Sequence, residues 1–111
     1  MTWRAIPGWE GLYEVSIDGQ IRSLRRKGRV MLPFTTEKGY LRVYLYRGTS
    51  VERVRVHTAV LRAFVGPRPA GMVTRHLDGN PANNHLSNLA WGTPAENEAD
   101  KKMHAAGLVA A

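Results

Sequence analysis

The sequence contains no cysteine among its 111 residues, which excludes disulfide bonds and zinc sites built from thiolates. A bound metal ion would therefore need histidine, asparagine, aspartate, glutamate or water as its ligands. No apolar run approaches the roughly eighteen residues that span a bilayer, and the opening residues MTWRAIPGWEG lack the charged head and apolar middle of a signal peptide. These absences predict an intracellular, cytoplasmic protein with no membrane partner.

Acidic residues are scarce in the middle of the chain. The formal net charge is +7, and residues 19–62 contain eleven Lys or Arg against only Glu37 and Glu52. Such a basic stretch indicates either a polyanionic partner or a well-solvated cationic surface. Charge alone does not distinguish DNA, RNA and an anionic membrane, but the sequence has no long amphipathic helix with a basic face, which disfavours the membrane.

The length is typical of one domain, and its first part reads as two β-hairpins. Residues 13–24, YEVSIDGQIRSL, alternate between apolar and polar side chains around Asp18-Gly19, a pair suited to a tight hairpin turn. A second hairpin is predicted from residues 39–46 and 51–56, which alternate in the same way and are joined by residues 47–50. Neither pattern is helical.

Basic side chains lie on and after these predicted strands. One face of the second hairpin would carry Leu41, Val43 and Leu45, and the other would carry Arg42, Tyr44 and Tyr46. Arginine interleaved with tyrosine can contact phosphates and stack on sugars or bases, although the tyrosines could instead be half-buried at the sheet margin. The residues predicted to contact nucleic acid are Arg22, Arg25, Arg26, Lys27, Arg29, Arg42, Arg55 and His85.

Helical spacing appears twice. Residues 57–65, HTAVLRAFV, place apolar side chains on one side, and Gly66 is a natural stop. A second helix is predicted from Pro94 to about Ala106, ending near Gly107. Its start combines a capping Thr93, proline in the first helical position and Glu96 three residues after the cap.

The stretch before that helix, residues 74–91, is TRHLDGNPANNHLSNLAW and contains four asparagines. Strand character at residues 72–76 and 88–91 gives the order strand, loop, strand, helix. Asparagine and aspartate satisfy loop backbone groups by hydrogen bonding to neighbouring amides and carbonyls. Several of these polar side chains are therefore expected to be structural.

The same residues resemble the HNH nuclease motif of phage and intron-encoded homing endonucleases. The matching positions are His76-Leu77-Asp78-Gly79-Asn80, Asn83-Asn84, Asn88-Leu89, Trp91, Thr93 and Glu96-Asn97, with steps of twelve residues from His76 to Asn88 and nine to Asn97. The segment IPGWEGLYEVSIDGQIRSL resembles the small module that precedes the nuclease in that family, and HTAVLRAF resembles its connecting helix. The likeness covers nearly the whole chain.

The resemblance implies an α+β fold of N-terminal β-hairpins and a connecting helix, followed by a ββα-metal motif. The first module would span residues 1–66 and the nuclease module residues 67–111, within one compact unit. The implied function is metal-assisted hydrolysis of duplex DNA, including nicking, with Mg²⁺ as the expected cofactor and Mn²⁺ as another possible ion. His76 would be the general base, Asn88 the brace of the loop and Asn97 a metal ligand.

Arg75 departs from the family pattern, because many members place there an acidic or amide side chain that binds the metal, and arginine cannot coordinate a cation. Three interpretations stay open. Asp78 or water completes a looser metal site, Arg75 clamps the phosphate, or the protein has lost cleavage and kept binding. Two other functions are therefore kept beside nuclease activity: a non-catalytic nucleic-acid-binding module of the same fold, and an RNA- or ribosome-associated protein.

Overall fold

The structure is a computed structural model that describes residues 2–105, with the side chains of all of these except Arg26, His104 and Ala105. It shows the predicted α+β architecture, with strands and a helix followed by a strand pair and a second helix. The predicted end of the last helix, at Ala106 and Gly107, lies outside the described residues. Within them, helix α2 spans Pro94–Ala105.

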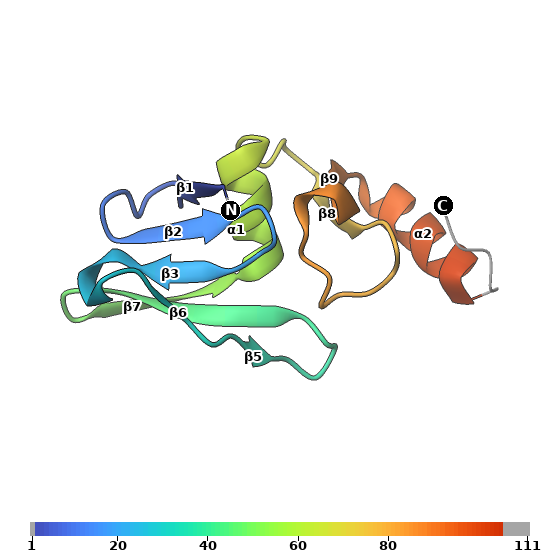
Figure 1. Cartoon of the computed structure of the whole chain (residues 1–111). Helices are drawn as coiled ribbons and strands as arrows, with labels where there is room; N and C mark the ends of the chain where they lie inside the picture. The colour runs from blue at the N-terminus through green and yellow to red at the C-terminus, as the bar shows by residue number, and fades with distance from the viewer. Residues whose placement is uncertain (1, 106–111) are drawn as a thin grey trace.

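Two antiparallel sheets form the N-terminal part (Figure 1). The first has four strands in sequence order: β1 (Trp3–Ala5), β2 (Tyr13–Ser16), β3 (Ile21–Ser23) and β4 (Arg29–Val30). A short 3₁₀ helix, η1 (Leu24–Arg26), joins β3 to β4. The second sheet has the order β5 (Phe34–Thr35), β6 (Leu41–Arg47) and β7 (Ser50–Arg55).

Both predicted hairpins are confirmed. Strands β2 and β3 pair around the Asp18-Gly19 turn, and β6 pairs with β7 from Arg42 opposite Arg55 to Arg47 opposite Ser50. The predicted faces of β6 are confirmed as well: Val43 and Leu45 are buried, whereas Tyr44 and Tyr46 are exposed. Tyr44 stacks on the ring of Phe34 with a centroid distance of 5.0 Å.

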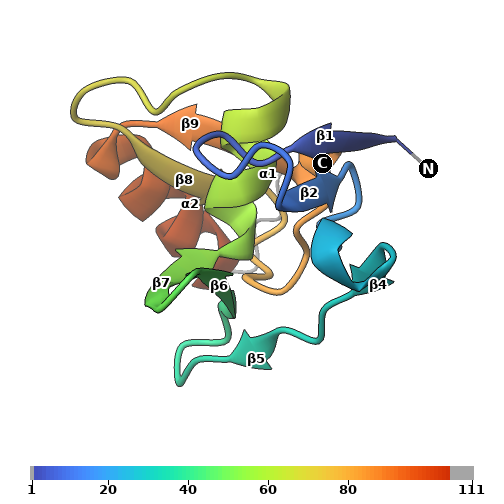
Figure 2. The same cartoon turned by 90° about the vertical axis from the view of Figure 1, so that its left-hand side faces the viewer.

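Helix α1 (Val56–Phe64) begins directly after β7 and connects the sheets to the C-terminal part. Figure 2 shows α1 between the N-terminal strands and the remaining elements. These are β8 (Val73–His76), a 3₁₀ turn η2 (Leu86–Asn88), β9 (Leu89–Gly92) and α2. The predicted order of strand, loop, strand and helix is therefore confirmed.

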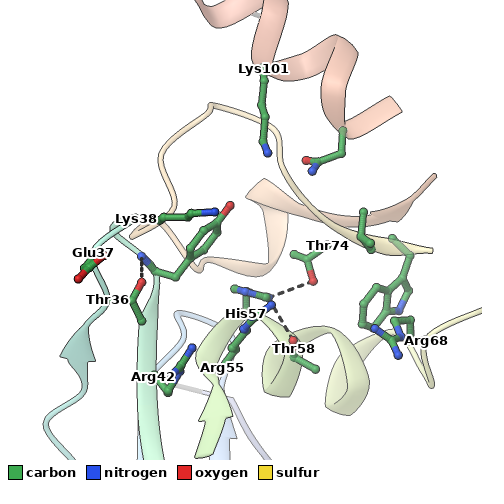
Figure 3. Close-up of a pocket in the computed structure, with 14 residues that line it drawn as sticks. Thr36, Glu37, Lys38, Arg42, Arg55, His57, Thr58, Arg68, Thr74 and Lys101 are labelled. Carbon is green, nitrogen blue, oxygen red and sulfur yellow. Dashed lines mark hydrogen bonds between the residues drawn. The ribbon is translucent and has the colours of Figure 1, made fainter. Parts of the chain in front are cut away.

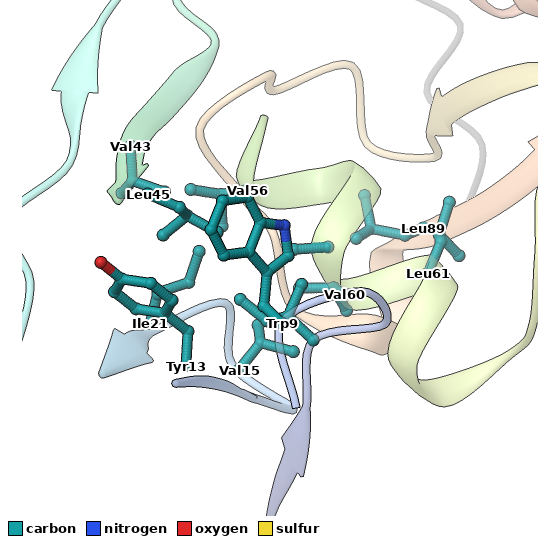
Figure 4. Close-up of a cluster of buried hydrophobic side chains, with 12 residues drawn as sticks. Trp9, Tyr13, Val15, Ile21, Val43, Leu45, Val56, Val60, Leu61 and Leu89 are labelled. Atoms are coloured by element: carbon teal, nitrogen blue, oxygen red, sulfur yellow. The ribbon is translucent and has the colours of Figure 1, made fainter. Parts of the chain in front are cut away.

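One hydrophobic core joins both sheets to α1 and β9 (Figure 4). Buried side chains of α1, among them Val60 and Leu61, meet Val15 of β2, Leu45 of β6 and Leu89 of β9. Removing this apolar surface from water stabilises the fold by roughly 25 cal/mol per Å². Because Leu89 belongs to this core, the strand opposite His76 is fixed relative to the N-terminal sheets.

Candidate active site

His76 is the last residue of β8 and lies opposite Leu89 of β9. Its side chain is buried, and its Nε2 atom lies 3.0 Å from the Oδ1 atom of Asn84 in the β8–β9 loop. An amide oxygen only accepts hydrogen bonds, so this contact places the imidazole proton on Nε2 and leaves the lone pair on Nδ1. Burial lowers the pKa of His76, although the Asn84 hydrogen bond opposes that change. The ring is therefore neutral at neutral pH.

His57, at the start of α1, packs edge-on against His76, with ring centroids 5.2 Å apart. Its Nδ1 lies 3.0 Å from the hydroxyl of Thr74, which is on the same face of β8 as His76. Burial lowers the pKa of His57 to about 3, with smaller contributions from His76 and Arg55. The ring of Tyr40 lies beside both histidines. The spacing of the sequence gave no indication of this cluster.

Asn88 holds the ends of the β8–β9 loop together. Its Oδ1 accepts a hydrogen bond from the Asp78 amide, and its Nδ2 donates to Asp78 Oδ1 and to the Asn83 carbonyl, each at 2.9 Å. Asn88 is itself buried. These are the contacts expected of the brace that the sequence predicts at this position.

The carboxylate of Asp78 is used by the same loop. It accepts hydrogen bonds from the Asn80 amide and from the side chains of Asn83 and Asn88. Burial would raise the pKa of Asp78, but these hydrogen bonds outweigh it and lower that pKa. Strand β8 ends two residues earlier, at His76, so Asp78 is a turn residue rather than a strand residue facing the base. Its surroundings do not support the prediction that it binds metal.

Arg75 points to helix α2. Its Nε and Nη2 atoms donate to the two carboxylate oxygens of Asp100 at 2.7 and 2.9 Å, and Nη1 lies 3.4 Å from Glu96. The hydrogen bond to Asp100 raises the pKa of Arg75. A Cβ atom at Gly92, on the neighbouring strand, would lie 2.1 Å from the Arg75 Cδ, so glycine leaves room for the guanidinium to cross the strand pair. The side chain is occupied by the helix and is not among the residues that line the pocket beside His76.

Asn97 faces that pocket from the first turn of α2. The helix begins with the predicted reciprocal cap, in which Thr93 N donates to Glu96 Oε1 at 2.9 Å and Glu96 N donates to Thr93 Oγ1 at 3.2 Å. The pocket has a volume of about 240 Å³. Its lining includes His76, Asn97, Asp100, Lys38 and Lys101. Thus the predicted base and the predicted ligand share one pocket, although their sequence positions are 21 residues apart.

A larger basic groove of about 600 Å³ adjoins it (Figure 3). Five cations line this groove: Lys38, Arg42, Arg55, Arg68 and Lys101. Arg42 and Arg55 were predicted to contact nucleic acid, whereas the other three come from segments where the sequence gave no such indication. Asn97, Lys38, Tyr40 and Lys101 line both the groove and the pocket. The groove therefore leads to His76.

The other predicted basic residues lie elsewhere. Arg22 is held by Glu14, with Nε 2.8 Å from Oε1, and lies over the ring of Trp3. Arg25 and Arg29 line a separate pocket with Tyr46, and Lys27 is exposed beside them, whereas Arg26 is described only as part of the backbone of η1. His85 Nε2 lies 3.2 Å from Asp18. Contact of these residues with nucleic acid stays a prediction.

Among the described residues, no three His, Asp or Glu side chains converge as a metal cluster. No helix in the described part of the chain is long and apolar enough to cross a membrane. The predicted cytoplasmic location and the division into modules at residue 66 stay predictions.

A buried histidine at the end of a β8–β9 pair, an asparagine brace and a capped helix that presents Asn97 define a ββα nuclease fold. Residues 54–99 match the family model of the HNH endonucleases, and residues 1–46 match the NUMOD4 motif. The chain belongs to the HNH endonuclease family. Enzymes of this family generally depend on a divalent metal ion.

Individual relatives come from phages. DNA endonuclease I-HmuI of Bacillus phage SP01 is 36% identical over 93 residues, which is 84% of this chain and 53% of that protein. Protein 3.8 of Escherichia phage T7 is 44% identical over 48 residues, or 43% of this chain and 40% of that protein. A solved structure, titled DNA binding and cleavage by the HNH homing endonuclease I-HmuI, superposes with a TM-score of 0.84 and 32% identity, covering 100% of this chain and 62% of the other. This chain therefore spans little more than half the length of I-HmuI.

Proposed function

We propose that this protein is a DNA endonuclease of the HNH type, which hydrolyses a phosphodiester bond by metal-assisted general-base catalysis. The observation that carries the proposal is the position of His76, a neutral imidazole in a pocket that opens into a groove lined by five cations. The name and the solved DNA complex of I-HmuI support the same substrate, duplex DNA.

His76 is the general base in this proposal. With its Nε2 proton held by Asn84, its Nδ1 lone pair accepts a proton from the water that attacks phosphorus. Because the pKa of His76 is lowered by burial, the base is already deprotonated at neutral pH. Such proton transfer contributes about 10²- to 10⁴-fold in rate.

The basic groove binds the DNA backbone in this proposal. Lys38 and Lys101 lie where the groove meets the pocket, so they approach the phosphate nearest to His76. Figure 3 shows Lys101 extending from α2 toward the groove, with Arg42 and Arg55 on the opposite side. Contacts to phosphate position DNA without reading its sequence.

The oxygen donors beside His76 suit a hard divalent ion such as Mg²⁺, with Mn²⁺ as the alternative. Asn97 offers an amide oxygen to the pocket, and Mg²⁺ sites are commonly completed by water and substrate phosphate. Such an ion would neutralise charge at the phosphate and assist the departing sugar oxygen. The strand position before the base holds Arg75, so a carboxylate ligand is missing from that side.

A second function is favoured by one observation, the ion pair of Arg75 with Asp100. If the side chain at position 75 leaves the pocket without a sufficient metal ligand, the protein binds DNA through the groove and does not cut it. Cleavage separates this alternative from the proposal.

The decisive experiment is nicking of supercoiled plasmid with added Mg²⁺ or Mn²⁺, comparing the parent with His76→Ala. The parent should nick DNA, and His76→Ala should lower the rate at least about a hundredfold, because the variant loses only the base. DNA affinity and melting temperature serve as controls and should change little. Full activity in His76→Ala would show that another group is the base, and a parent that binds DNA without nicking it would favour the binding module.

A further inference from the structure

The acid missing from β8 has a counterpart on α2. At the position where the family resemblance places a metal-binding side chain, this protein has Arg75, and its guanidinium makes a two-point contact with Asp100. The strand thus carries the cation and the helix carries the carboxylate. Asp100 was not singled out by the sequence, because only its distance from Arg75 in the fold gives it significance.

Asp100 lies on the same side of α2 as Asn97. The two are three residues apart, so their side chains are neighbours on the helix surface. Both line the 240 Å³ pocket that contains His76. The Asp100 side chain is only 15% exposed, which fixes it at the pocket wall rather than in bulk solvent.

We propose that Asp100 supplies the carboxylate of the divalent metal site that β8 lacks, with Asn97 as the second oxygen donor and Arg75 as the counter-ion of Asp100. This inference rests on the proposed function, and it moves the acidic ligand from the strand to the helix. Asp78 is the only other acid that the sequence offered for this role, and its carboxylate is used by three hydrogen bonds within the loop.

The contact with Arg75 leaves Asp100 able to bind a cation. An ionised carboxylate has two oxygens with about four lone-pair sites, and Arg75 uses one site on each oxygen. Glu96 lies 3.4 Å from the same guanidinium, so Arg75 keeps an acidic partner when an ion binds Asp100. The ion and Arg75 nevertheless compete for the same negative charge.

That competition predicts weak metal binding in the absence of DNA. Lys38 and Lys101 also line the pocket and add positive charge around the two donors. Phosphate oxygens from DNA would offset this charge and complete the coordination sphere, as is usual for Mg²⁺.

The test is Mn²⁺ binding to the full chain, measured by titration calorimetry without DNA. The parent should bind Mn²⁺ weakly, and Asp100→Asn should weaken binding at least tenfold. The matched control is Glu98→Gln, which removes an acid from the same helix whose side chain is 63% exposed and pairs with Lys101. Its Mn²⁺ affinity should equal that of the parent. Arg75→Gln should bind Mn²⁺ severalfold more tightly, because the competing cation is gone.

Asp100→Asn leaves Arg75 without its main partner and could unfold α2, so the double variant Arg75→Gln/Asp100→Asn is the second arm. It has no uncompensated charge at the contact and should keep the parent melting temperature while losing Mn²⁺ binding. A folded double variant with parental Mn²⁺ affinity would show that Asp100 is only a structural partner of Arg75. A parent that binds no Mn²⁺ at millimolar concentration would overturn the proposal as well.

Plasmid nicking separates this inference from the proposed function. If the parent nicks DNA and Asp100→Asn binds Mn²⁺ and nicks as the parent does, the inference fails and the nuclease function stands. If Mn²⁺ binding depends on Asp100 but the parent cuts no DNA, the metal site stands and the nuclease function fails.

Discussion

His57 and His76 are a pair of buried, neutral imidazoles between the N-terminal sheets and the ββα motif. Each is satisfied by a polar neighbour, Thr74 for His57 and Asn84 for His76. The lowered pKa of both rings means that the folded protein resists protonation. Their chemistry is therefore linked to the pH dependence of folding.

Stability should fall as the pH is lowered from about 6.5 toward 3. In that range the unfolded chain takes up a proton on His57, whose unfolded pKa is near 6.5, whereas the folded ring stays neutral because its pKa is about 3. The free energy of unfolding should then decrease by up to about 1.4 kcal/mol per pH unit from this residue. His76 contributes in the same direction, starting below its unfolded value. Urea unfolding at pH 7, 6 and 5 measures the slope.

The matched variant is His57→Asn, which removes the titrating ring and leaves a polar side chain beside Thr74. Its unfolding free energy should depend less steeply on pH than that of the parent. An identical slope in the two proteins would mean that His57 titrates in the folded state as it does in water.

The turn of the first hairpin, between β2 and β3, packs against the β8–β9 loop. Leu86 N donates to the Ile17 carbonyl at 2.9 Å, and His85 lies beside Asp18. Gly19 has a φ of +85°, and a Cβ there would lie 2.8 Å from the Asn84 Cβ. The hairpin turn therefore fixes Asn84, which in turn orients His76.

Gly19→Ala should consequently lower nicking at least about tenfold, because displacement of Asn84 releases the base from its orientation, on which general-base efficiency depends. Gly48→Ala is the control, since Gly48 also has a positive φ, +57°, but a Cβ there meets nothing within 4 Å. Both variants carry the strain of alanine at positive φ, about 1–2 kcal/mol. Melting temperature and nicking rate are measured for each. Equal activity in the two variants would show that the turn does not position the site.

The two modules meet at a basic groove, and five cations from separate segments line it. Each phosphate contacted by such a residue contributes about −0.9 to the slope of log K against log salt. The groove therefore predicts duplex DNA binding that weakens steeply with salt.

Replacing Lys38, Arg42 and Arg68 by Gln should reduce that slope by up to about 2.7 in magnitude, which is about 0.9 for each lost contact. The comparison variant replaces Arg25 and Arg29 by Gln, because these residues line a separate pocket with Tyr46. Fluorescence anisotropy with a short duplex at several salt concentrations gives both slopes. If only the second variant flattens the slope, DNA binds to the pocket of Arg25 and Arg29 and not to the groove.

Much of the fold follows from local sequence. The alternation around Asp18-Gly19, the helical spacing from His57 and the cap at Thr93 and Glu96 each depend on a few neighbouring residues, and all three elements are found in the structure. Strands β1, β4 and β5 have only two or three residues, too few to show a period, so they were missed. Their pairing comes from the strands beside them.

The sequence alone determined the family, the base candidate His76, the brace Asn88 and the ligand candidate Asn97, because these lie in one continuous motif with characteristic spacing. Only the tertiary structure decided what faces them. Asp100 is 25 residues from Arg75, and the cations that meet at the groove are spread from Lys38 to Lys101. Such contacts depend on how α1 and the shared core place the two modules, and a local pattern carries no information about that placement.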